Sequence, residues 1–396
     1  MEVERRADVV IVGGAIVGSS IATFLAMHPD WSGRIVVVER DLGYRTASTT
    51  LSAASIRLQF STPLNIEISR FGVELIRSPG RWLSVDGAPP PGADFVEGGY
   101  LFLATDAGLP TLRANHAVQR EHGVNVQLLD PDALRGRFPW LRLDGLAGGS
   151  LGLSDEGWFD AHALLQSFVR KARSLGVTYL PGTVIGIDHD QSAIRGVRLA
   201  DGSGISTELV VDAAGPRAAE VAAMAGLELP VHPRKRHVYH FDCRERIGPT
   251  PLTILPSGVY FRPEGEAWIG GRSPRDGEPD PDTLDLEPDR GFFDRVIWPA
   301  LAERVPAFEA VRLLDTWAGH YEVNTLDHNA VIGPHPALPG FLFANGFSGH
   351  GLQQAPAVGR GLAELIATGR YQTLDLSPLG YERIARNEPI RELNVV

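Results

Sequence analysis

Glycines near the start of the chain recur at a spacing that lets backbone approach phosphate groups. The segment VVIVGGAIVGSS holds Gly13, Gly14 and Gly18, and Ala15 stands where a middle glycine is usual. In a dinucleotide-binding turn the first glycine permits the tight turn, the second admits the pyrophosphate, and the third packs helix on strand. Because Gly14 keeps the turn open, we expect a small shift of the phosphates to accommodate the methyl group of Ala15.

An acidic residue follows at the spacing expected of a ribose contact. RIVVVER ends in Glu39 and Arg40, and Glu39 lies about 20 residues beyond Gly18. The glycine turn follows a buried strand, opens a helix that includes Val17, and leads to a second buried strand, which is the context such a site requires. We therefore predict a nucleotide cofactor. The alternative is a glycine turn in an α/β sheet that binds no nucleotide.

A second glycine-rich loop, NGFSGHGLQQ, lies near the C-terminus. Its glycines let backbone N–H groups come close to a ligand, and a helix is expected to begin just after them. The N-terminus of a helix carries partial positive charge and attracts anionic groups. The loop residues predicted to contact the cofactor are Gly346, Ser348, Gly349, His350, Gly351, Leu352 and Gln353. The alternative is a helix-capping loop with no ligand.

Alternating buried strands and helices must position these two loops. Residues 7–40 predict a βαβ unit, because ADVVIVGG and RIVVVER are continuous apolar runs around a helical pattern. Residues 62–78 predict a helix, and FDAHALLQSFVRKARSLG predicts another that ends at a glycine. A β-meander should then end in a buried strand, ELVVDAAG, and the C-terminal loop should join a strand to a long helix.

Antiparallel segments are inserted between these α/β segments. The proline-rich GAPPPGAD is a plausible domain crossing, FVEGGYLFLA predicts a pair of strands, and residues 231–272 predict a broad antiparallel sheet. The fold class is therefore α/β (α+β): a Rossmann-like cofactor domain interleaved with an antiparallel-sheet substrate domain. We expect the cofactor domain to comprise residues 1–80, 150–225 and 326–396. The substrate-binding domain should comprise residues 81–149 and 226–325.

Composition and charge exclude several classes of partner. The chain of 396 residues carries a net charge of −11, which disfavours nucleic acid. Its single cysteine, Cys243, excludes an intramolecular disulfide, and the start of the chain lacks the apolar region of a secretory signal. No apolar run approaches the length of a membrane span. We expect a cytoplasmic protein without a nucleic-acid or membrane partner, and its oligomeric state stays open.

Seven segments, in order along the chain, carry a further signal. They are VVIVGGAIVGSSIA, VVVERD, ASTTLSAASIRLQFS, VVDAAGPRA, GVYFRPEGEAWIGG, TWAGHYEVNTLDHNAVIG and NGFSGHGLQQAPAVGRGLAELI. Together they resemble the D-amino-acid oxidase superfamily of FAD flavoproteins, and within it the branch of sarcosine oxidase and dimethylglycine dehydrogenase. The resemblance covers nearly the whole chain. It implies that the cofactor is FAD and that the Rossmann-like part is the FAD-binding domain.

The resemblance implies further contacts with FAD. STTLSAAS would pass the flavin and the pyrophosphate, VVDAAG would lie by the adenosine and phosphates, and GTVIG would lie near the adenine. The residues implied are Ser48, Thr49, Ser52, Ala53, Val184, Ala214 and Gly215. The helix N-terminus near Leu352 would stabilise the negative charge of reduced flavin.

The resemblance also implies a substrate side. Family enzymes oxidise a C–N bond by hydride delivery to flavin N5, and an arginine, lysine or tyrosine usually holds the substrate carboxylate. Amino-acid oxidising relatives carry an arginine after the WAG segment, where this chain has Tyr321, which resembles the sarcosine-type branch. Tyr260, in GVYFRP, matches an active-site tyrosine of the family.

Three positions depart from the sarcosine oxidases. Gln353 stands where they have the lysine that binds the carboxylate, and Trp268 stands where they have the lysine that assists the reaction with oxygen. Gly319 stands where they have the cysteine that binds the flavin covalently. We therefore expect non-covalent FAD, with oxygen or another electron acceptor. Arg272 is the favoured carboxylate anchor and Arg57 a second candidate, because a guanidinium grips a carboxylate with two hydrogen bonds. The alternative for Arg272 is a surface arginine.

The histidines lack the spacing of a metal site, so no metal is expected. His320 is a candidate pocket residue, and the basic cluster HPRKRH offers Arg236 or His237 to tune the charge of the pocket. As a solvated turn, that cluster would need no function.

The sequence thus predicts an FAD-dependent amine or amino-acid oxidase or dehydrogenase that acts on CH–NH donors. The expected substrate is a small-molecule N-substituted amino acid or related secondary or tertiary amine, oxidised to an imine that water hydrolyses. One alternative is a primary D-amino-acid or glycine oxidase. Others are a flavoprotein subunit or assembly factor without independent turnover, and an NAD-dependent dehydrogenase.

Overall fold

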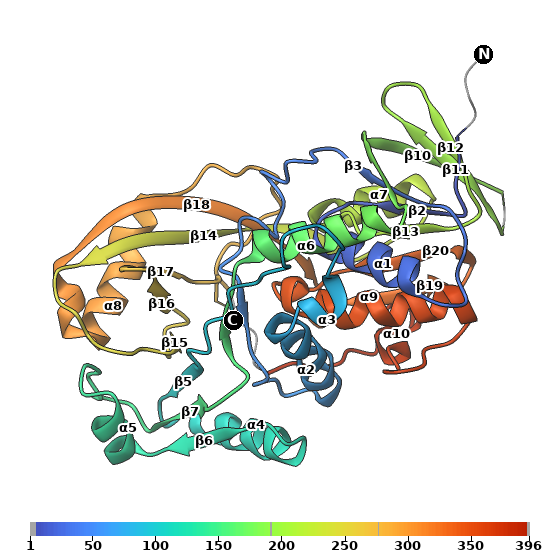
Figure 1. The fold of residues 1–396 in the computed structure, drawn as a ribbon. Coiled ribbons are helices and arrows are strands. Elements are labelled where there is room, and N and C mark those ends of the chain that lie inside the picture. Colours follow the sequence, from blue (N-terminus) through green and yellow to red (C-terminus); the bar gives the residue numbers. More distant parts are fainter. Residues whose placement is uncertain (1–4, 191, 276, 394–396) are drawn as a thin grey trace.

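Six strands form a mostly parallel sheet in one half of the molecule (Figure 1). The structure is a computed structural model that describes residues 5–190, 192–275 and 277–393, so the two ends of the expected cofactor domain lie outside the described residues. In spatial order the strands are β19 (Val331–His335), β20 (Leu338–Asn345), β13 (Val210–Asp212), β2 (Val9–Val12), β3 (Ile35–Glu39) and β9 (Thr178–Pro181). All neighbours pair in parallel except β19, which is antiparallel to β20.

Both faces of this sheet are buried, as its continuous apolar strands require. Val9 and Ile11 of β2 face one apolar core, and Val10 and Val12 face the other. The first core is covered by helices that pack on one another in Figure 1. They are α1 (Ile16–Met27), α2 (Pro63–Arg77), α3 (Gly80–Leu83), α6 (Ala161–Ser174) and α9 (Gly351–Thr368).

The second core is covered by a small sheet and a short helix. The strands are β1 (Arg5–Arg6), β12 (Gly204–Ser206), β11 (Ile194–Leu199) and β10 (Val184–His189), and the helix is α7 (Ala218–Met224). The predicted βαβ unit, the helix over 62–78 and the long C-terminal helix are confirmed. The meander is present, but β9, expected at its start, belongs to the parallel sheet instead.

An eight-stranded sheet fills the other half of the molecule. Its strands in spatial order are β18 (Val311–Asn324), β14 (Val231–Cys243), β17 (Ala267–Gly271), β16 (Tyr260–Glu264), β15 (Leu252–Ile254), β5 (Tyr100–Ala104), β7 (Gly148–Gly152) and β6 (Val126–Leu129). The broad antiparallel sheet predicted over 231–272 is therefore present, although β15 pairs with β5 in parallel. Strand β7 crosses the domain boundary expected at residue 150.

The strand pair predicted in FVEGGYLFLA is wrong. Only its second half forms a strand of the large sheet, β5, while Val96 makes an isolated bridge to Trp158. Gly99 explains the difference, because its φ of +78° turns the chain between the two halves.

Aromatic side chains fill the core of the large sheet on the side of α8 (Trp298–Arg304). Phe241, Phe261 and Trp268 all lie within 5.1 to 5.4 Å of the Phe308 ring, measured between ring centroids. Two further helices, α4 (Leu109–Glu121) and α5 (Pro131–Arg137), flank β6 and β7 (Figure 1).

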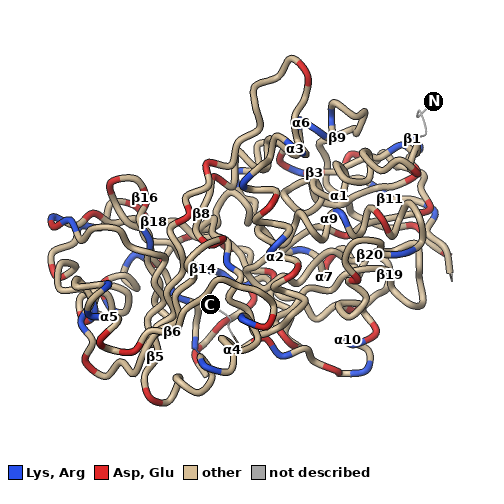
Figure 2. The backbone as a smooth tube through the Cα atoms, turned by 60° about the horizontal axis from the view of Figure 1, so that its bottom comes forward, with Lys and Arg blue, Asp and Glu red and all other residues tan. Residues whose placement is uncertain are grey.

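Local signals set several helix ends. Asp130 and Asp160 cap α5 and α6 by accepting backbone hydrogen bonds of 2.8 Å, and Gly176 ends α6 with a φ of +91°. The remaining short elements are β4 (Ser55–Ile56), β8 (Gly157–Trp158) and α10 (Glu382–Arg386). Basic and acidic residues are interspersed over both halves of the molecule (Figure 2). Within the described residues, no helix is long and apolar enough to cross a membrane.

Candidate functional site

A cavity of about 560 Å³ opens where the carboxyl ends of β2, β3 and β13 face the large sheet. Its wall gathers residues from β10, β14, β16, β18 and the start of α9 as well. The predicted cofactor residues on the wall are Gly13, Ala15, Val17, Glu39, Arg40, Ser48, Thr49, Ser52, Ala53, Val184, Ala214, Gly215, Gly349, Gly351 and Leu352. Segments far apart in the sequence therefore meet at one site.

The turn between β2 and α1 has the shape that its glycines predict. Gly13 has a φ of +99°, and a Cβ there would lie 2.3 Å from the carbonyl oxygen of Ala213. A Cβ on Gly18 would lie 1.9 Å from the carbonyl oxygen of Gly13. Gly14 and Gly18 are not on the cavity wall, so they shape the turn, whereas Ala15, the N-cap residue of α1, lies on the wall.

Hydrogen bonds fix the acid at the end of β3. The Glu39 carboxylate accepts from the backbone N–H of Gly14 at 2.8 Å and from that of Asp41 at 2.9 Å. These two bonds hold the carboxylate at the cavity beside the glycine turn.

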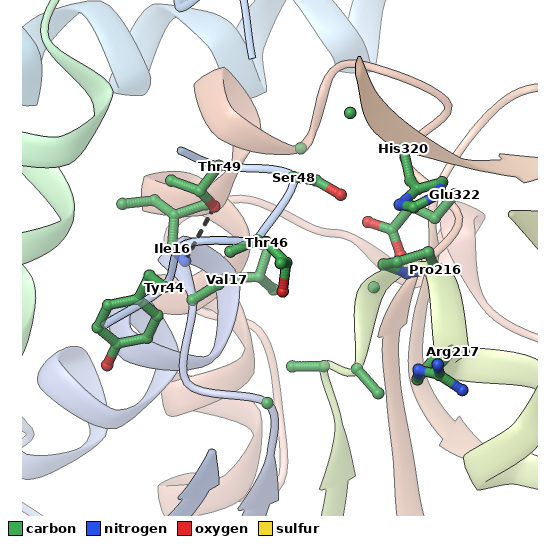
Figure 3. Close-up of a pocket in the computed structure, with 18 of the residues that line it drawn as sticks. Ile16, Val17, Tyr44, Thr46, Ser48, Thr49, Pro216, Arg217, His320 and Glu322 are labelled. Carbon is green, nitrogen blue, oxygen red and sulfur yellow. Dashed lines mark hydrogen bonds between the residues drawn. The ribbon is translucent and has the colours of Figure 1, made fainter. Parts of the chain in front are cut away.

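The segment 44–53 crosses the N-terminus of α1. Thr49 Oγ1 accepts a 3.4 Å hydrogen bond from the backbone N–H of Ile16, drawn as a dashed line in Figure 3. The hydroxyl of Ser48 is buried, points into the cavity, and has no hydrogen-bond partner among the described residues. A buried hydroxyl without a partner is costly unless a ligand satisfies it.

The C-terminal loop closes one side of the cavity. Gly349 has a φ of +99°, and a Cβ there would lie 2.4 Å from Cε2 of Tyr321. Of the other predicted loop contacts, Gly346, Ser348, His350 and Gln353 are not on the wall. Ser348 Oγ accepts from the backbone of Asn324 at 3.1 Å, so this side chain shapes the loop.

Tyr260, Tyr321 and Arg236 meet on the wall at the large sheet. The Arg236 guanidinium lies 5.2 Å from the centroid of the Tyr321 ring and is held by two hydrogen bonds, of 2.7 and 2.9 Å, to the Asp280 carboxylate. Burial raises the pKa of both Tyr260 and Tyr321, so both phenols are neutral at neutral pH. His320 also lies on the wall, and burial lowers its pKa.

Arg57 lies behind this wall rather than on it. Its Nη1 donates to the carbonyl oxygen of Gln59 at 2.6 Å, and its Nη2 lies 2.9 Å from Nε2 of His350. Burial, followed by the charge of Arg57, holds the pKa of His350 well below its usual range, so a neutral imidazole accepts the hydrogen bond. The positive charge of Arg57 also acts on Tyr321.

Arg272, the favoured carboxylate anchor, lies outside the cavity wall. Its guanidinium forms an ion pair with Glu278 and lies 5.4 Å from the centroid of the Phe292 ring. The structure thus brings Tyr260 and Tyr321 to the cavity and places Arg272 in a different set of contacts.

The sequence profile of a family described as FAD dependent oxidoreductase (DAO) matches residues 8–365. This chain belongs to the DAO family. FAD is therefore its cofactor, and the protein is an FAD-dependent oxidoreductase related to amino-acid and sarcosine oxidases.

Relatives in the DAO family match almost the whole chain. FAD-dependent oxidoreductase domain-containing protein 1 of Xenopus laevis is 42% identical over 99% of this chain and 85% of its own length. Human sarcosine dehydrogenase is 28% identical over 92% of this chain but only 40% of its own length. The solved structure of L-proline dehydrogenase from P. horikoshii superposes with a TM-score of 0.86, at 29% identity, covering 98% of this chain and all of that one.

The residues of the cavity fit FAD. The glycine turn would present the N-terminus of α1 to the pyrophosphate, and the Ser48 hydroxyl, which has no partner among the described residues, faces the same space. Gly182 and Thr183 extend the wall beyond Val184, where the resemblance expects the adenine. The volume and donors of the cavity therefore suit a dinucleotide, as the family requires.

Sequence reasoning missed four charged residues of the wall, Asp41, Arg217, Glu220 and Glu322. Arg217 lies two residues after Gly215, the last residue of the predicted VVDAAG segment, and this closeness in sequence was the available signal. Glu322 directly follows Tyr321 on β18. Neighbouring residues of a strand usually face opposite sides of the sheet, so the sequence pattern did not predict that both would lie on one cavity wall. Its enclosed position raises the pKa of the Glu322 carboxyl to about 8.

Proposed function

We propose that this protein oxidises the C–N bond of an N-substituted amino acid or a related secondary or tertiary amine. One observation carries the proposal: an arginine and two neutral tyrosines share a cavity wall with the FAD-binding turn. Similarity to sarcosine dehydrogenase and to L-proline dehydrogenase, whose names specify secondary amino acids, supports the same substrate class.

The side chains on the wall have separate tasks in this proposal. Arg236 attracts the substrate carboxylate, and the hydroxyls of Tyr260 and Tyr321 orient the substrate by hydrogen bonds. FAD, when bound, accepts the hydride from the carbon next to nitrogen, and water then hydrolyses the imine. We assign the carboxylate contact to Arg236 in place of Arg272, because only Arg236 of the two lies on the wall. Arg57 adds positive charge from behind Tyr321.

The test is anaerobic reduction of the yellow holoprotein by a panel of N-methyl, cyclic secondary and primary amino acids. Bleaching by the first two classes supports the proposal, and the rate of recovery in air separates an oxidase from a dehydrogenase. Preference for primary amino acids would favour a D-amino-acid or glycine oxidase. A flavin that no amine bleaches would favour a subunit or assembly factor without independent turnover.

Arg236→Gln tests the carboxylate contact. We expect kcat/KM for the amino acid to fall about 10- to 100-fold, as for loss of a charge-assisted hydrogen bond. For the matching amine without a carboxylate, kcat/KM should change less than about threefold. Arg272→Gln is the matched control and should leave the ratio of the two substrates unchanged. An equal loss for both substrates in Arg236→Gln would refute the contact.

The predicted cofactor contacts that lie on the cavity wall are part of this proposal, as are the division into two domains and non-covalent binding of FAD. We also keep the cytoplasmic location as a proposal, since a chain with the single cysteine Cys243 needs no oxidising compartment.

A further inference from the structure

Glu322 places a carboxyl group inside the FAD cavity. It lies on β18 next to Tyr321, and its side chain points into the cavity toward the hydroxyl of Ser48 on the opposite wall (Figure 3). One carboxyl oxygen, Oε2, accepts a 3.3 Å hydrogen bond from the backbone N–H of Gly346. The backbone N–H of Phe347 also interacts with the carboxyl group, and both N–H groups favour its ionised form, but burial outweighs them.

Within the described part of the chain, no cationic side chain forms an ion pair with Glu322. From β13, Asp212 adds a second carboxyl, and on β14 the residue paired with Glu322 is Pro233. Arg217 lies on the turn Gly215–Arg217, which packs on β18. Its guanidinium donates hydrogen bonds of 2.7 and 3.0 Å to the Glu220 carboxylate. His320, two residues earlier on β18, has its pKa lowered by burial and is neutral.

Burial, reinforced by the proximity of Asp212, raises the pKa of Glu322 to about 8. The carboxyl group is therefore protonated at neutral pH and carries an O–H donor. With the Ser48 hydroxyl, it offers two neutral donors on opposite walls, next to the helix N-terminus that receives the pyrophosphate.

We propose that Glu322 binds FAD as a neutral carboxylic acid, donating a hydrogen bond to the pyrophosphate–ribityl part, and that its ionisation weakens FAD binding. The reason is electrostatic: a neutral acid donates to a phosphate or hydroxyl oxygen, whereas a carboxylate repels the pyrophosphate. The proposal concerns the cofactor alone and stands independently of the amine substrate.

The sign of the pH dependence follows from this arrangement. At pH values well below 8 the acid is protonated and FAD affinity is independent of pH. Above that value each unit of pH lowers the protonated fraction tenfold, so the Kd for FAD rises up to tenfold per unit.

The test measures the Kd for FAD from pH 6 to 9.5, by dilution of the holoprotein and fluorescence of the released flavin. In the natural protein we expect a flat Kd up to pH 7 and a steep rise above 8. Glu322→Gln keeps a neutral donor, so its Kd should stay within about threefold of the low-pH value throughout the range. Asp212→Asn is the matched control, and its Kd should still rise with pH.

Several outcomes would overturn the proposal. A flat profile in the natural protein would do so without any variant, and so would a Glu322→Gln profile that rises as steeply as the natural one. Glu322→Gln that binds FAD tenfold more tightly at pH 6.5 would mean that Glu322 is already ionised. Loss of the rise in Asp212→Asn alone would make Asp212 the titrating group.

Discussion

The substitution Asp212→Asn tests whether a buried carboxyl beside the cofactor loop is neutral. Asp212 ends β13 and is 0% exposed. Its Oδ1 accepts hydrogen bonds from the backbone of Ala214 at 3.0 Å and from Asn345 Nδ2 at 3.3 Å, while Oδ2 has no partner among the described residues. Burial raises its pKa from an ordinary value of 3.8 to about 8.

This shift sets the magnitude and the sign of the expected effect. Between pH 5 and pH 7 the unfolded chain has lost the Asp212 proton, whereas the folded protein keeps it. The natural protein therefore loses about 1.4 kcal/mol of stability per pH unit through this group. An asparagine does not titrate, so the free energy of unfolding of Asp212→Asn minus that of the natural protein should rise by about 2.7 kcal/mol over these two units.

The assay is urea unfolding followed by circular dichroism at pH 5, 6 and 7, with FAD in constant excess. A pH-independent effect of the asparagine on the free energy of unfolding shifts the difference between the two proteins equally at every pH, so it does not change the trend. Groups that titrate alike in both proteins cancel in that difference. Asp106→Asn, at an exposed position, is the control and should show no trend. A difference between Asp212→Asn and the natural protein that stays flat or falls from pH 5 to 7 would show that Asp212 is ionised in the fold.

Two further predictions concern the framework of the site. Gly13→Ala should lose about 2–5 kcal/mol and weaken FAD binding, because left-handed backbone strain adds to the clash with Ala213. Gly87→Ala, also at positive φ but in open space, should lose only about 1–2 kcal/mol; equal losses in chemical unfolding would contradict the steric argument. Arg383→Met should lose about 3–5 kcal/mol, because it leaves the buried carboxylate of Asp327 without its 3.0 Å ion pair. Arg386→Met, at a side chain that is 68% exposed, should change thermal stability little, so a similar fall in both variants would argue against the buried pair.

Much of the local structure could be predicted because it depends on neighbours in the chain. The turn at Gly13 follows from backbone sterics, and the end of α6 at Gly176 follows from the freedom of glycine to adopt a positive φ. Continuous apolar runs indicated strands buried on both faces. Of the glycine turn, Gly13 and Ala15 lie on the cavity wall, whereas Gly14 and Gly18 do not.

The same local signals gave less guidance where a turn competed with a strand. FVEGGYLFLA has the composition of two strands, yet the positive φ of Gly99 separates Val96 from β5. The segment at Thr178–Pro181 alternates like its successors but joins the parallel sheet beside β3. Strand composition does not say which sheet a strand enters, because pairing partners lie far away in the chain.

Thus the sequence by itself determined the family, the cofactor and the glycine turn at the start of α1. Only the tertiary structure decided which charged groups line the cavity. Arg236, in the basic cluster HPRKRH, lies on the cavity wall. Arg272, which follows the glycines of WIGG, instead forms an ion pair with Glu278. Glu322 is an ordinary acid in the sequence, and its neutral form arises from enclosure beside Asp212. Sterics and caps act over a few residues, whereas burial and charge are set by every element that packs around a group.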